Sequence, residues 1–178
     1  MPLTPFHYPV AYVVSKLNKK LSLPGLMVGS MFPDLEIPII ILLFGTRIPD
    51  RALLHSLVGA ASIGTILSVI FTVLMYPLLT SSLFKIDKHK IESKCRLSFA
   101  LIFSCFIGNL SHVLLDIVNH PYNPIFWPFS QSTPSPICLA LGDMQNASLI
   151  IHTILIVLFA SLLIDQRKNL WEKLLVGE

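Results

Sequence analysis

The chain has 178 residues, of which 53% are hydrophobic and 13% charged, with a net charge of +3 and a mean hydropathy of +0.72. This composition is too apolar for an ordinary soluble protein and predicts a single membrane-embedded domain, residues 1–178. Nucleic-acid binding is not expected, because the basic residues form short clusters beside apolar segments and not a basic face.

Five apolar segments follow one another along the chain. Residues 6–17 are short for a span, and we expect either a helix partly inserted from outside, which we favour, or an interfacial helix. Residues 23–44 are interrupted by prolines but long enough to cross, and 53–79, 97–118 and 147–164 suit the ~20 residues of a transmembrane helix. The expected fold is all-α, a polytopic transmembrane bundle of four spans plus the partly inserted N-terminal helix.

Small residues recur every fourth position in two of these segments. One series is Ser56, Ala60, Gly64, Ser68 and Thr72, and the other is Ala100, Ser104 and Gly108. Small side chains at this spacing allow helix backbones to approach closely in lipid, so we expect a tightly packed bundle. The alternative is that membrane helices are simply rich in small residues.

The segment 119–146 contains five prolines together with Tyr122, Phe126, Trp127 and Phe129. Prolines at this density exclude a spanning helix. We expect an outer loop that forms either a lid or rim for a binding site, or an aromatic anchor at the membrane surface.

The Lys and Arg residues indicate the orientation of the chain. Five lie in the 85–96 loop, three near the C-terminus and three at positions 16–20, whereas only Arg47 and Arg51 fall on the opposite side. Because basic residues near span ends stay cytoplasmic, we expect a multi-pass protein of the plasma membrane with the 85–96 loop and the C-terminus inside.

Ionisable residues occur within or beside the apolar segments, where charge is costly and usually serves function. His112 and Asp116 are four residues apart, so they project from one helix face and can share a metal. By the expected topology, His55 and His152 lie at similar depth toward the outer face. Asp34 follows a proline that can turn it into the same cavity, and His7 joins only if the first helix is inserted from outside.

Imidazoles and carboxylates without thiolates suit zinc, with manganese or iron as competitors. The number of candidate ligands indicates either two or more ions or one ion with supporting side chains. His120 either joins them or serves the outer loop. Serine-based catalysis is less favoured, because Ser56 and Ser111 have no nucleophile-elbow motif around them. Cys95, Cys105 and Cys138 lack metal-binding or disulfide patterns and are expected to be free thiols.

The motifs MPLTPFH, GSMFPDLE, DRALLHS and GNLSHVLLDIVNHPYNPIFWPF, with His152 in the last span, resemble the YdjM-like family of membrane-bound metal-dependent hydrolases. The order His, Asp, His, HxxxD, His is also similar to the zinc-dependent phospholipase C and single-strand nuclease superfamily. The resemblance implies metal-ligand roles for the following residues: His7, Asp34, His55, His112, Asp116, and His120 or His152. One departure is Asp50, which stands where the family pattern usually has a histidine.

These observations favour a membrane-embedded, zinc-dependent phosphoester hydrolase with Asp34 and Asp116 as catalytic carboxylates and a membrane lipid as substrate. The alternatives are a non-catalytic membrane protein, as a complex subunit or a metal or proton conduit, and a transporter. An oligomer or a larger complex is compatible with all of them.

Overall fold

The structure is a computed structural model that describes residues 4–45, 51–165 and 170–177. Asp50 and Arg47 lie outside the described residues. The described residues form an all-α bundle that includes four helices long and apolar enough to cross a membrane, which confirms the predicted fold class. These four are Leu23–Phe44, Leu57–Leu74, Phe99–Asn119 and Met144–Ile164.

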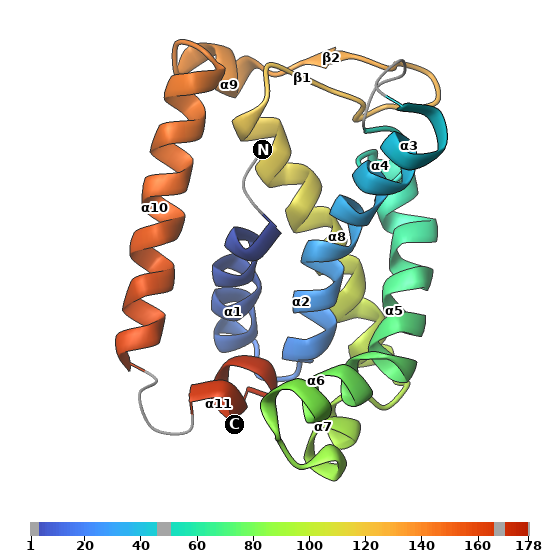
Figure 1. Ribbon diagram of the computed structural model, residues 1–178. Helices are drawn as coiled ribbons and strands as arrows, with labels where there is room; N and C mark the ends of the chain where they lie inside the picture. The colour runs from blue at the N-terminus through green and yellow to red at the C-terminus, as the bar shows by residue number, and fades with distance from the viewer. Residues whose placement is uncertain (1–3, 46–50, 166–169, 178) are drawn as a thin grey trace.

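The N-terminal segment consists of the 3-10 turn η1 (Thr4–His7) and helix α1 (Tyr8–Leu17). Helix α1 is much shorter than the spans and lies between α10 and α2 (Figure 1). Its buried face carries Tyr8, Ala11 and Tyr12, and the Tyr8 hydroxyl donates a hydrogen bond to the Leu174 carbonyl at 2.8 Å. The first helix is therefore anchored inside the bundle.

The first span is built from α2 (Leu23–Met31), the 3-10 turn η2 (Phe32–Leu35) and α3 (Glu36–Phe44). Ser22 begins it by accepting a hydrogen bond from the Gly25 amide. Pro33 has no amide hydrogen to donate, and the helix tightens locally into the 3-10 turn that contains it. This turn holds Asp34.

The second span begins at Leu57 as α4 (Leu57–Gly59), a π turn η4 (Ala60–Gly64) and α5 (Thr65–Leu74). The sequence predicted one helix over 53–79. The helix instead starts after Ser56, which accepts a hydrogen bond from the Gly59 amide, and breaks at Met75 before Pro77. The chain continues in α6 (Tyr76–Phe84) and α7 (Lys88–Lys94).

The third span, α8 (Phe99–Asn119), packs directly against α2. A Cβ added to Gly108 would lie 2.9 Å from the Gly29 Cα and 2.8 Å from the Ser30 nitrogen, so only glycine fits this crossing. On the other side of α8, the Asn109 amide donates to the Ser68 hydroxyl at 3.0 Å. Both predicted series of small residues thus contribute to close helix packing.

The remaining elements are β1 (Tyr122–Asn123), β2 (Thr133–Pro134), α9 (Pro136–Ala140), α10 (Met144–Asp165) and α11 (Leu170–Leu175). The two short antiparallel strands and α9 cover one end of the bundle, whereas α6, α7 and α11 cover the other (Figure 1). No span occurs between 119 and 143, as predicted. Cys95, Cys105 and Cys138 are free and buried.

Candidate functional site

Five ionisable side chains meet inside the bundle: His7, Asp34, His55, His112 and Asp116. We call these five residues the cluster. They come from η1, η2, the turn before α4, and α8, and each is at most 7% exposed. The two members on α8 lie in its second half, toward the end of the bundle that β1, β2 and α9 cover (Figure 1).

Four ligand atoms in the cluster face one another at similar distances. His112 Nε2 lies 3.6 Å from Asp34 Oδ1 and 3.7 Å from Asp116 Oδ2. His55 Nε2 lies 3.9 Å and 3.8 Å from the same two oxygens. These separations exceed those of ordinary hydrogen bonds, and none of the four atoms has a hydrogen-bond partner among the described residues.

His55 and His112 each have a hydrogen-bond partner at Nδ1, the ring nitrogen that does not face Asp34 and Asp116. His112 Nδ1 lies 2.8 Å from the Ser30 carbonyl oxygen, which can only accept. His55 Nδ1 lies 2.9 Å from a carboxylate oxygen of Glu36. When both rings are neutral with Nδ1 donating, their Nε2 lone pairs face the carboxylates, and a shared cation would compensate both sets of atoms.

The geometry also matches the dimensions of a metal site. Zinc ligands lie ~2.0–2.2 Å from the ion, so two ligand atoms of a tetrahedral site are roughly 3.3–3.6 Å apart. The His112 Nε2–Asp34 Oδ1 distance of 3.6 Å matches this spacing, and the other three distances, 3.7, 3.8 and 3.9 Å, are longer than it by at most a few tenths of an ångström. The residues present therefore fit a divalent metal ion.

Two overlapping groups could hold such an ion: Asp34 with His55 and His112, and His7 with His112 and Asp116. Within each group the ligand atoms lie within 4.8 Å of one another. The His7 ring stacks on the His112 ring at 4.1 Å, and neither of its nitrogens has a hydrogen-bond partner among the described residues. Because His112 Nδ1 is engaged by Ser30, only Nε2 remains, and the two groups share it.

Glu36 positions His55 from a distance of 19 residues in sequence. Its carboxylate accepts hydrogen bonds from the amides of Ala52, at 3.1 Å, and Leu54, at 3.0 Å, as well as from His55. This carboxylate–histidine pair has the form that commonly orients a metal-binding imidazole. Glu36 lies in the apolar segment 23–44, but nothing in its sequence spacing connects it with His55.

His120 lies beside the cluster and outside both candidate metal groups. Its Nδ1 is 3.5 Å from Arg51 Nη2, and Arg51 Nη1 is 3.9 Å from Asp116 Oδ2. Burial, followed by the neighbouring Arg51 charge, lowers the pKa of His120 to about 3. His120 is therefore neutral at physiological pH and reaches the cluster through Arg51, a contact that no sequence pattern indicated.

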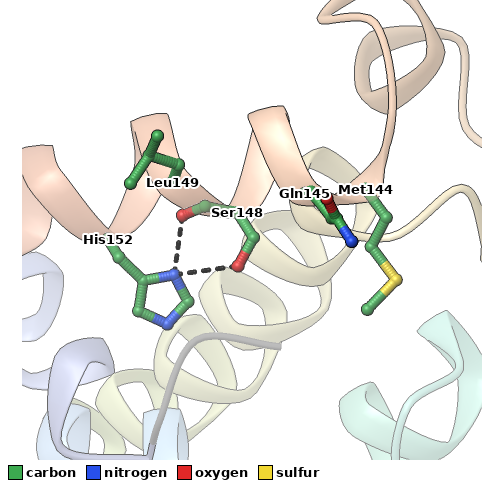
Figure 2. Close-up of a pocket in the computed structure, with 5 residues that line it drawn as sticks. All are labelled: Met144, Gln145, Ser148, Leu149 and His152. Carbon is green, nitrogen blue, oxygen red and sulfur yellow. Dashed lines mark hydrogen bonds between the residues drawn. The ribbon is translucent and has the colours of Figure 1, made fainter.

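His152 occupies a different environment on α10 and is also outside both groups. Figure 2 shows its ring beside Ser148, whose carbonyl oxygen is 2.7 Å and whose hydroxyl is 3.1 Å from Nδ1. The ring contacts Phe6 edge-on at 5.7 Å and lines a cavity of about 620 Å³ along α10. The structure thus brings together five of the seven predicted ligands and places His120 and His152 around them.

Neither serine next to a cluster histidine is arranged as a nucleophile. The Ser56 hydroxyl donates to the Leu53 carbonyl and accepts from the Gly59 amide. The Ser111 hydroxyl donates to the Gly108 carbonyl. Both hydroxyls are therefore engaged in hydrogen bonds to nearby backbone groups.

The fold and the cluster together define an all-helical membrane protein with buried histidine and aspartate groups that could hold a metal ion. A family model described as YdjM inner membrane protein matches residues 8–176, so the chain belongs to this family. No curated protein and no solved structure matches the chain.

Proposed function

We propose that this protein is a membrane-embedded, metal-dependent hydrolase of phosphoester bonds, with a membrane lipid as substrate and zinc as the favoured metal. One observation carries the proposal: two imidazole Nε2 atoms and two carboxylate oxygens face one another inside an apolar bundle without hydrogen-bond partners among the described residues. Isolated groups of this kind are costly to bury, and a bound cation would compensate them.

The residues of the cluster would divide the work. His55 and His112 would hold the ion together with Asp34 and Asp116, and Glu36 and the Ser30 carbonyl orient the two imidazoles. When bound, a divalent ion supplies Lewis-acid stabilisation of the charge on a phosphoryl oxygen. Asp34 and Asp116 are the carboxylates available to accept the proton of an attacking water. Arg51, beside Asp116 and 17% exposed, is placed where an anionic substrate would approach.

The proposal includes an orientation with the cluster in the outer half of the plasma membrane and the 85–96 loop inside, as the basic residues predict. The order of histidines and aspartates in the zinc-dependent phospholipase C superfamily supports the same chemistry. A lipid would then reach the cluster from the outer leaflet.

The metal is tested first, by elemental analysis of purified protein beside the His112→Ala and Asp116→Asn variants. We expect about one equivalent of transition metal in the wild type and a large loss in both variants, with His89→Ala, an exposed loop position, as the matched control. Wild-type protein without metal, or variants that retain it, would refute the site.

Activity is tested separately, with phosphatidylglycerol and phosphatidylethanolamine in mixed micelles and with a water-soluble phosphodiester. We expect metal-dependent release of the lipid headgroup, either with or without the phosphate. Asp34→Asn should abolish this release. Stoichiometric metal without turnover of either substrate class would reject the hydrolase and leave a metal-binding membrane protein.

A further inference from the structure

An apolar cavity of about 240 Å³ lies between α2, η2 and α5. Its walls include Met27, Met31, Phe32, Leu35 and Phe71, and the Phe32 and Phe71 rings meet edge-on across it at 6.1 Å. Thr4 supplies the hydroxyl of the lining near the cluster, and Tyr76 lies at the opposite end, where its own hydroxyl donates to the Leu175 carbonyl. The cavity therefore offers a ligand an almost entirely apolar lining.

The cavity begins beside the cluster. Thr4 lines the cavity and belongs to η1, the 3-10 turn that contributes His7 to the cluster. Phe32 and Leu35, which line it as well, flank Asp34 in the η2 turn. From η2 the cavity follows α2 back to Met27, seven residues before Asp34, a length of roughly 10 Å along a helix.

The surroundings of the cavity are those of lipid. Both bordering segments, Leu23–Phe44 and Leu57–Leu74, are long and apolar enough to cross a membrane. Neighbouring side chains on them are exposed and apolar, with Ile39 55%, Ile70 49% and Leu74 60% exposed. A buried water needs about two to four hydrogen-bonding groups, and this apolar lining offers few. A hydrocarbon chain fits the lining.

We propose that one acyl chain of a membrane phospholipid occupies this cavity, with the phosphate of that lipid at the cluster. The identification of the lipid as substrate rests on the proposed function, whereas binding of the chain does not. The chain would extend from the depth of Asp34, midway along the span Leu23–Phe44, along α2 toward Met27. Methionines suit this role, because their flexible side chains adapt to chains of different shape.

The chain site is tested by photocrosslinking in nanodiscs of phosphatidylethanolamine and phosphatidylglycerol, a few per cent of which carries a diazirine midway along one acyl chain. After irradiation, peptides are mapped by mass spectrometry. We expect crosslinks concentrated at Met27, Met31 and Phe71. Crosslinks distributed over the exposed positions such as Ile39 and Ile70, without enrichment in the cavity, would overturn the proposal.

A matched pair of variants separates the chain site from catalysis. Met31→Trp fills the cavity, whereas Ile39→Trp adds the same volume to the exposed face of the same span. In Met31→Trp we expect loss of the crosslink at Met27 with metal content unchanged; retention of that crosslink would contradict the proposal. If a water-soluble phosphodiester is hydrolysed normally by Met31→Trp while lipid turnover falls, the bound chain belongs to the substrate. Cavity crosslinks in a protein without any turnover would uphold the chain site and reject the hydrolase.

Discussion

At the scale of single residues, the position of His112 explains most of the cluster. Its ring is stacked on His7, its Nδ1 is engaged by the Ser30 carbonyl, and its Nε2 points at Asp34 and Asp116. Every side of this fully buried imidazole thus has an assigned neighbour. Such fixed orientation is what metal binding requires, because ordering a mobile ligand would weaken affinity.

The role of Glu36 leads to a prediction about affinity. Glu36→Gln keeps the size of the side chain but removes the charge that orients and polarises His55, so we expect metal affinity to fall roughly 10–100-fold. Competition titration with a zinc-sensitive dye measures this change. Glu92→Gln, at a half-exposed position of α7, is the control and should leave affinity unchanged. Equal affinity in Glu36→Gln and wild type would contradict the assigned role.

His120 leads to a prediction about pH. Its pKa in the folded protein is about 3, lowered mainly by burial, against about 6.5 when unfolded. The unfolded chain therefore binds the extra proton, and this contribution to stability is complete above pH 6.5 and lost as the pH falls toward 3. We expect the melting temperature of His120→Gln in detergent to fall less steeply with decreasing pH than that of the wild type. Exposed His89→Gln should behave as wild type.

At the scale of elements, the contact of α2 with α8 determines where the cluster forms. Gly29 of α2 meets the backbone of Cys105 and Gly108 of α8, and Gly25 lies against Leu101 and Ser104. This approach brings the Ser30 carbonyl within hydrogen-bond distance of His112. The helix crossing and the cluster are thus parts of one arrangement.

Gly108→Ala tests this coupling. The new methyl group would press on the Ser30 nitrogen and the Gly29 Cα, so we expect a loss of about 1–3 kcal/mol in stability together with reduced metal content. Thermal unfolding in detergent and elemental analysis measure the two effects. Ala160→Leu, which enlarges an exposed position of α10, should change neither. A destabilised variant that keeps its full metal content would contradict this coupling between the helix crossing and metal binding.

At the scale of the whole molecule, the two ends of the bundle differ in chemistry. The end near α6, α7 and α11 carries the basic 85–96 loop, whereas β1, β2 and α9 cover the end nearest the cluster (Figure 1). The charge distribution predicts that the first end is cytoplasmic.

Cysteine labelling tests this orientation. In a background without native cysteines, Phe129→Cys, 91% exposed in the 120–143 segment, should react with a membrane-impermeant maleimide in intact right-side-out vesicles. His89→Cys, in the basic loop, should react only after the vesicles are permeabilised. The reverse pattern would place the cluster toward the cytoplasm.

Hydropathy and residue spacing were sufficient to predict the four spans, because length and lack of charge are strong signals in lipid. They also included the five cluster residues among seven candidate ligands, since His112 and Asp116 share a helix face and the others stand out as ionisable residues in apolar surroundings, but they did not separate these five from His120 and His152. They could not predict the Ser30 carbonyl, because a backbone acceptor has no sequence signature. The pairing of Glu36 with His55 and the π turn at 60–64 depend on tertiary packing and were equally invisible.

Glu36 also affects how the sequence can vary. Its one carboxylate binds the Ala52 and Leu54 amides and the His55 ring, so it joins the chain directly across the stretch that separates them. The position of His55 is then set by these hydrogen bonds and not by the length of chain between Glu36 and Ala52. Insertions or deletions between Glu36 and Ala52 that keep these hydrogen bonds should leave His55 in place, so the geometry of the cluster can persist when the length of this connection changes.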